Sequence, residues 1–224
     1  MANILVIAPH PDDEVLGCGA TIKKYAELGN EVYLCIVTKP YTPDWTEEYI
    51  ENKKKEIKAS NEVLSIKETF FLDLPTVKLD TLSQKQLNDL ISDCVKKVNP
   101  EVVYIPFFGD INKDHQLVSK ACLVAVRPKP DSRIKKVFLY EVLSETEWAK
   151  PAQKIEEVFI PNNYEDISDF LDYKLKAMEA YKSELKQYPH PRSLEGIKVL
   201  AQKRGMEAGL KYAEAFMSLR EINN

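Results

Sequence analysis

The pentapeptide His10-Pro-Asp-Asp-Glu14 gathers one imidazole and three carboxylates in a single turn. It directly follows an apolar run, 4–8, of the kind that forms a buried strand. Open α/β sheets place their chemistry at the carboxyl ends of strands. Pro11 fixes its own φ, so His10 and Asp13 can both turn toward one point. Imidazole and carboxylate are ligands of zinc-type ions, and the turn therefore predicts part of a metal site.

A simpler interpretation is that Asp12, Asp13 and Glu14 only complement the dipole of a following helix. That accounts for the acids but not for His10. On the metal interpretation, Asp12 stays free beside the metal-bound water, where a carboxylate can remove a proton. Glu14 is then expected to serve the turn and the helix start.

His115, one of only three histidines, is the expected third ligand. It closes the segment Asp110-Ile-Asn-Lys-Asp-His115, after a second buried strand, so it can face the same crevice as His10. The alternative is a lone histidine at a helix start, held by Asp110 or Asp114. Asp114 could equally orient the imidazole of His115 as a metal ligand, an arrangement common around metals.

The third histidine lies in Tyr188-Pro-His-Pro-Arg-Ser193, where two prolines predict a stiff, extended connector. His190 could be a further ligand, a substrate contact or a surface residue. Arg192 could pair with an anionic or hydroxyl-rich substrate.

The elements that must position these residues alternate between apolar runs and helical periods, which predicts a mostly parallel sheet flanked by helices. Ser83 is expected to cap one helix, and Gly29 to end another. The last two predicted strands follow each other without a helix, so this part of the sheet could be mixed. The last third of the chain is predicted to be helical. The expected strands are 4–8, 31–38, 69–74, 102–107, 136–143 and 155–160, and the expected helices are 15–28, 47–64, 83–98, 114–126, 167–185 and 193–220.

Length and composition exclude several classes of protein. The 224 residues show no linker or repeat, so we expect one domain spanning 1–224. A net charge of -4, with both signs interspersed, gives no reason to expect nucleic acid as a partner. The four cysteines form no C-x-x-C pair, which disfavours a disulfide framework or thiolate metal site. No apolar run suits a membrane span or secretion signal, so a cytoplasmic location is expected. No phosphate-cradling glycine motif supports a nucleotide cofactor.

Taken together, these residues resemble the PIG-L/LmbE-like family of zinc-dependent N-deacetylases. The resemblance rests on Ala8-Pro-His-Pro-Asp-Asp-Glu14 joined with Asp114-His115, and is supported by Ser144-Glu-Thr-Glu-Trp148, Tyr188-Pro-His-Pro-Arg-Ser193 and Tyr212-Ala-Glu-Ala-Phe216. It implies a Rossmann-like α/β fold and hydrolysis of an N-acetyl amide, typically on a small glucosamine-containing molecule. By motif match, His10, Asp13 and His115 would hold Zn²⁺ or another divalent ion, and Asp12 would be the general base.

Two positions depart from the family pattern. Many members have a second histidine where this chain has Asn112, and asparagine cannot transfer a proton. His190 could substitute for it. A frequent arginine of the second helix is replaced here, by Lys53 on this interpretation. The alternatives are therefore an amidase of a thiol-sugar conjugate and a catalytically impaired metal- or ligand-binding homologue. A homo-oligomer is possible in each case.

Overall fold

The computed structural model describes residues 1–149 and 157–223. Its helices and strands alternate over most of the chain, as the sequence predicts. In chain order they are β1 (Asn3–Ala8), α1 (Asp13–Glu27), β2 (Glu31–Lys39), α2 (Glu47–Leu64), β3 (Glu68–Pro75), the 3₁₀ turn η1 (Leu79–Thr81), α3 (Gln84–Val98), β4 (Val102–Pro106), α4 (Lys113–Ala125), β5 (Lys136–Tyr140), β6 (Asn163–Asp166), α5 (Leu171–Ala180), α6 (Leu194–Ala208) and β7 (Ala213–Glu221).

The strands of the described residues form one sheet in the order β3-β2-β1-β4-β5-β7-β6. The pairs among β1 to β5 are parallel, whereas β7 runs antiparallel to both β5 and β6. The strand order reverses beside β1, because β2 lies on one side of it and β4 on the other. This switch point is where open α/β sheets bind ligands. The predicted mostly parallel, Rossmann-like α/β fold is confirmed.

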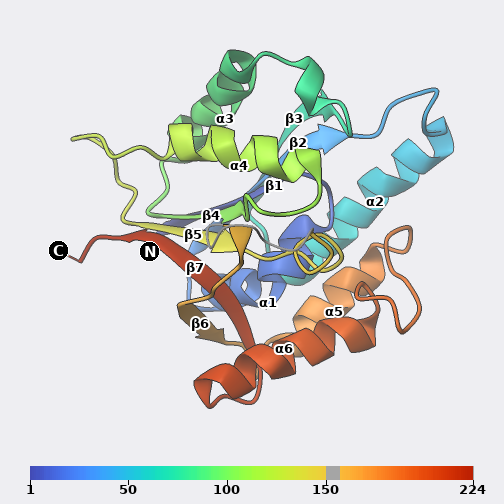
Figure 1. Cartoon of the computed structure of the whole chain (residues 1–224), viewed down its shortest axis with the longest axis vertical. Coiled ribbons are helices and arrows are strands. Elements are labelled where there is room, and N and C mark those ends of the chain that lie inside the picture. Colours follow the sequence, from blue (N-terminus) through green and yellow to red (C-terminus); the bar gives the residue numbers. More distant parts are fainter. Residues whose placement is uncertain (150–156, 224) are drawn as a thin grey trace.

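Helices cover both faces of the sheet (Figure 1). α3 and α4 lie on one face, and α1, α2, α5 and α6 lie on the other. Within β1, Ile4 and Val6 pack into the core of one face, while Leu5 and Ile7 pack into the core of the other. A strand buried on both faces has no need of polar residues, which explains the unbroken apolar run before the turn.

Helix α1 packs tightly against the end of the sheet. A Cβ on Gly17 would lie 2.2 Å from Cδ2 of Tyr140, so only glycine fits at this approach. The Tyr140 hydroxyl in turn donates to the carbonyl of Ile7 at 2.8 Å. Farther along α1, the carboxylate of Glu214 on β7 accepts from the backbone N–H groups of Ala20 and Thr21. These contacts fix the start of α1 against the carboxyl end of β1.

Three predicted elements differ from the structure. The helix expected at 193–220 is too long, because Gly209, with φ 72°, ends α6 in the left-handed region, and β7 follows. The helix expected at 167–185 is shorter, since α5 covers only Leu171–Ala180. The strand expected at 155–160 is wrong for 157–160, whereas 155 and 156 lie outside the described residues, and the sixth strand is β6.

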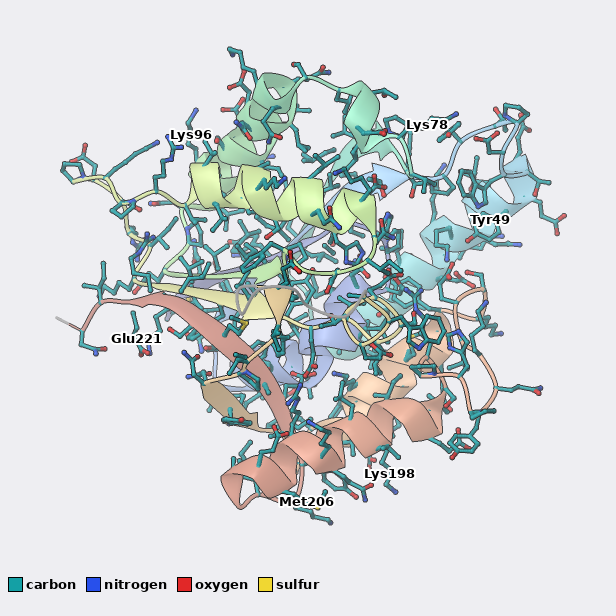
Figure 2. The ribbon with its side chains drawn as sticks, in the orientation of Figure 1. Tyr49, Lys78, Lys96, Lys198, Met206 and Glu221 are labelled. Atoms are coloured by element: carbon teal, nitrogen blue, oxygen red, sulfur yellow. The ribbon has the colours of Figure 1, made fainter. Side chains whose placement is uncertain are left out.

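Helix α6, which forms the first part of the segment predicted to be the last helix, is amphipathic. Ile197 and Ala201 of α6 are buried against the body of the protein, whereas Lys198 and Met206 lie on its outer face (Figure 2). Among the described helices, none is both long and apolar enough to cross a membrane.

Candidate metal centre

The turn after β1 is held by its own side chains. The backbone N–H of His10 donates to Oδ2 of Asp13 at 2.8 Å, and that of Asp12 donates to Oε2 of Glu14 at 3.0 Å. Asp12 has φ 116° and ψ -25°, a conformation that costs a residue with a side chain free energy. The hydroxyl of Tyr181, directly after α5, donates to Oε1 of Glu14 at 2.6 Å. Glu14 therefore serves the turn, as expected, and its hydrogen bond offsets part of the strain at Asp12.

Three ligand-type atoms meet at the mouth of this turn with nearly equal separations. His10 Nδ1 lies 3.2 Å from His115 Nε2 and 3.3 Å from Asp13 Oδ2. His115 Nε2 lies 3.2 Å from the same carboxylate oxygen. Over residues 1–149 and 157–223, this is the one group of three or more His, Cys, Asp or Glu side chains that could hold a metal ion.

A carboxylate orients each imidazole. His115 Nδ1 lies 2.8 Å from Oδ2 of Asp110, and His10 Nε2 lies 3.0 Å from Oδ2 of Asp114. When each ring donates its N–H to that carboxylate, its other nitrogen presents a lone pair to the three-atom group. Asp110 also accepts the hydroxyl of Thr146 at 2.6 Å, and Asp114 accepts two backbone N–H groups from the segment after β3.

The carboxylates give this cluster a strong affinity for positive charge. Burial opposes a charged His10, but hydrogen bonds to Asp114 and Asp13 outweigh burial and raise its pKa to about 9. Burial likewise opposes a charged His115, yet the charge of Asp13 and the hydrogen bond to Asp110 raise its pKa well above 6.5. Without a bound metal, the negative charge of these carboxylates therefore favours protonation of the two imidazoles.

The same atoms fit a divalent metal ion. Ligands about 2.0–2.1 Å from a tetrahedral zinc ion lie about 3.3–3.4 Å apart, close to the separations of 3.2 and 3.3 Å found here. The other oxygen of Asp13, Oδ1, is buried without a hydrogen-bond partner, a cost that a neighbouring cation would relieve. Two imidazoles and one carboxylate suit zinc and several other first-row ions. His10, Asp13 and His115 are thus a candidate metal site, and the donors alone leave the metal's identity open.

A cavity of about 260 Å³ adjoins the three-atom group. This volume lies just below the usual range of about 300–1,000 Å³ for ligand pockets, so it suits a small molecule or one part of a larger one. Its walls come from distant parts of the sequence: His10, Pro11, Asp12, Thr38, Pro40, Trp45, Tyr49, Lys53, Thr76, Val77, Asn112, Glu145, Glu184 and Arg192.

Arg192 joins two carboxylates of the cavity wall. Its Nη1 lies 3.0 Å from Oδ2 of Asp12, and its Nη2 lies 3.0 Å from Oε1 of Glu145. Its Nε donates to Oγ of Ser144 at 2.8 Å. Burial raises the pKa of Asp12, and the guanidinium works against that rise. The sequence suggested that Arg192 could pair with substrate. The structure places it in the cavity wall, where Nε, Nη1 and Nη2 each contact one of the protein's own side chains.

The remaining predicted candidates have distinct environments. Asn112 lines the cavity and caps α4, since its Oδ1 accepts the backbone N–H of Asp114 at 3.0 Å. His190 is not a lining residue of the cavity. Its Nδ1 accepts the backbone N–H of Arg192 at 3.1 Å, and its ring packs against Trp148 with 5.2 Å between centroids. Lys53 lines the cavity, where it donates to Glu184 at 2.6 Å.

Sequence reasoning missed two acidic residues of the cavity. Glu145 lies in the Ser144–Trp148 motif, but nothing in the sequence distinguishes Glu145 from the other residues of that motif. Nothing in the sequence singled out Glu184. The sequence offered both Asp110 and Asp114 as partners of His115. The structure places Asp110 on His115, whereas the assignment of Asp114 to His115 is wrong, because Asp114 lies on His10.

Comparison with known proteins gives consistent matches. The sequence profile described as PIG-L: GlcNAc-PI de-N-acetylase matches residues 5–126. The uncharacterized deacetylase YaiS of Escherichia coli (strain K12) is 30% identical over 190 residues, which cover 81% of this chain and 91% of YaiS. The diacetylchitobiose deacetylase of Thermococcus kodakarensis is 26% identical over 222 residues, covering 95% of this chain and 81% of that protein. The crystal structure of the conserved protein TT1542 from Thermus thermophilus matches with a TM-score of 0.77 and 25% identity, covering 100% of this chain and 97% of that one.

Proposed function

Because this chain belongs to the PIG-L, or GlcNAc-PI de-N-acetylase, family, we propose that it is a metal-dependent N-deacetylase of a small, sugar-containing substrate. The observation that carries the proposal is that ligand atoms of His10, Asp13 and His115 lie at nearly equal distances from one another. They lie beside Asp12, at a cavity of about 260 Å³. Relatives named as deacetylases, one of them for diacetylchitobiose, support both the reaction and the substrate class.

His10, Asp13 and His115 would hold the metal, which we propose is zinc. A bound ion of this kind supplies Lewis acidity, which makes water more acidic and polarises an acyl carbonyl. Asp110 and Asp114 keep the ligand imidazoles in the required tautomers.

Asp12 is the proposed general base. It removes a proton from water as the bond between the water oxygen and the acyl carbon forms. Once protonated, it returns that proton to the amine nitrogen as the carbon–nitrogen bond breaks. Arg192 fixes the carboxylate of Asp12 for both steps through its 3.0 Å contact. A merely structural metal would not need this additional carboxylate, which argues against a catalytically impaired homologue.

We further propose that residues 1–224 form one domain and that the enzyme is cytoplasmic. All four cysteines, Cys18, Cys35, Cys94 and Cys122, are buried and unpaired, which is consistent with a reducing compartment.

Metal analysis and one substitution test the chemistry. Protein purified without chelator should contain close to one equivalent of a divalent ion. Asp12→Asn should keep the metal yet lose at least about 100-fold in amide hydrolysis, the usual scale of general-base loss. Asp93→Asn, which changes an exposed carboxylate of α3, is the matched control. A fully active Asp12→Asn variant, or protein that takes up no metal on reconstitution, would refute this assignment.

A substrate screen distinguishes the remaining alternatives. The panel contains N-acetylglucosamine, diacetylchitobiose, acetylated sugar nucleotides and thiol-sugar amides. Turnover of the thiol-sugar amides alone would favour the second amidase hypothesis. Metal-loaded protein that binds these compounds without hydrolysing any of them would favour the impaired homologue.

A further inference from the structure

The turn after β5 contains four polar side chains in succession, Ser144 to Glu147, and each of them has a partner within the protein. The Thr146 hydroxyl donates to Asp110, the carboxylate that orients one ligand imidazole. Ser144 Oγ accepts from the arginine of the cavity wall. Glu147 Oε1 accepts the backbone N–H of Ser144 at 2.6 Å. Of the four, only Glu145 lines the cavity, so its side chain is available to a ligand.

Glu145 is positioned as firmly as the proposed base. Its Oε1 and the Oδ2 of Asp12 each lie 3.0 Å from a different Nη of Arg192, so one planar guanidinium sets the spacing of the two carboxylates. The backbone carbonyl of Glu145 accepts the N–H of Ile111 at 3.0 Å, which ties the turn to the loop before α4. Its side chain is 14% exposed.

Hydrolysis of an amide is favoured by a group that stabilises the departing nitrogen, and neither Asn112 nor His190 is placed to be that group. A scissile secondary amide carries an N–H, and its nitrogen gains positive charge when it is protonated. A carboxylate can accept that N–H and stabilise the charge. Asn112 is uncharged, and its oxygen already caps α4. His190 is not a lining residue of the cavity.

Resting on the deacetylase function above, we propose that Glu145 is a second catalytic carboxylate, which accepts the N–H of the scissile amide and stabilises the positive charge on the departing nitrogen. Protons balance without its titration: one passes from water to Asp12 and then to the nitrogen, while the carbon–oxygen bond forms and the carbon–nitrogen bond breaks. Glu145 neither gains nor loses a proton.

The proposal separates amides from esters, because an ester has no N–H and its leaving oxygen acquires no such charge. Glu145→Gln should lower kcat/KM for the acetamide substrate by about 10- to 100-fold, the scale of one charged hydrogen bond. Hydrolysis of p-nitrophenyl acetate should fall by much less than hydrolysis of the acetamide, and the bound metal should stay unchanged. Glu141→Gln is the matched control: Glu141 is 13% exposed and pairs with Arg204 at 2.7 Å, outside the cavity lining. It should leave both rates unchanged.

A binding measurement gives a readout that is independent of turnover. By calorimetry, metal-loaded wild-type protein should bind glucosamine more tightly than glucose, which lacks the amine. Glu145→Gln should reduce that preference by about 10-fold or more, whereas Glu141→Gln should retain it.

Three results would overturn the proposal: equal losses of amide and ester hydrolysis, an unchanged amide rate, or a glucosamine preference that is absent or insensitive to Glu145→Gln. If the metal-loaded wild-type protein hydrolyses no amide, the proposed function fails and the catalytic role of Glu145 fails with it, whereas the glucosamine comparison still shows whether Glu145 binds an amino group.

Discussion

Substitution of Asp110 tests whether the carboxylate behind His115 prepares the metal site. Asp110 is completely buried, its Oδ2 lies 2.8 Å from His115 Nδ1, and its Oδ1 accepts the hydroxyl of Thr146. Asp110→Asn keeps the shape and can still accept from His115 through its one oxygen. It removes the charge, however, and turns an NH₂ group toward Thr146. Loss of such an orienting carboxylate costs about 10- to 100-fold in metal affinity, or about 1.4–2.7 kcal/mol.

Asp110→Ala should have a larger and different effect. It leaves the buried N–H of His115 and the half-buried hydroxyl of Thr146 without this partner, at a cost of about 1–3 kcal/mol for each group. The expected loss of about 2–6 kcal/mol is a large share of a typical free energy of unfolding of about 5–15 kcal/mol.

The assays are competition titration against a zinc chelator and urea unfolding, with Asp93→Asn as the exposed control. An Asp110→Asn variant with wild-type zinc affinity would show that the carboxylate does not prepare His115. An Asp110→Ala variant with wild-type stability would show that the two polar groups find other partners.

Three further predictions concern the turn, α1 and pH. Tyr181→Phe deprives buried Glu14 of its 2.6 Å donor and should lower the unfolding free energy by about 1–3 kcal/mol in urea melts; an unchanged midpoint would contradict the role of that bond. Gly17→Ala should cost about 1–3 kcal/mol or more, because the new Cβ would lie 2.2 Å from Tyr140, and wild-type stability would show that α1 shifts freely. Without metal the pKa of His10 is raised to about 9 and that of His115 well above its ordinary value, and a protonated imidazole cannot bind metal. Zinc affinity should therefore fall by at least about tenfold for each pH unit below about 9; a pH-independent affinity in chelator titrations would refute this.

The parts of the fold and site that could be predicted are those encoded locally. The apolar run of β1 identifies a strand buried on both faces, and the adjoining turn carries two of the three candidate ligands. His115 could be added because its helix follows a neighbouring parallel strand, β4, at the same edge of the sheet. The order of residues along the chain therefore sufficed to predict the three residues of the candidate metal site.

What could not be predicted depends on contacts between distant segments. The β7 sequence Ala-Glu-Ala-Phe-Met-Ser-Leu-Arg-Glu is rich in helix-forming residues, yet it forms a strand because β5 and β6 pair with it on either side. Gly209 was the local signal that could have ended the helix. The meeting of Glu145 and Arg192, 47 residues apart, has no counterpart in the spacing of either motif.

The origin of the site's residues along the chain has an evolutionary consequence. The candidate ligands all lie within residues 5–126, the part matched by the family profile, whereas Glu145, Glu184 and Arg192 of the cavity wall lie beyond it. The candidate metal ligands and these three residues of the cavity wall thus come from separate stretches of sequence. Mutations in the later stretch can change which molecules are accepted while the metal ligands stay intact. A directed-evolution library meant to redirect this protein should therefore diversify Glu184 together with lining residues such as Trp45 and Tyr49, and leave the candidate ligands, Asp12, Glu145 and Arg192 unchanged.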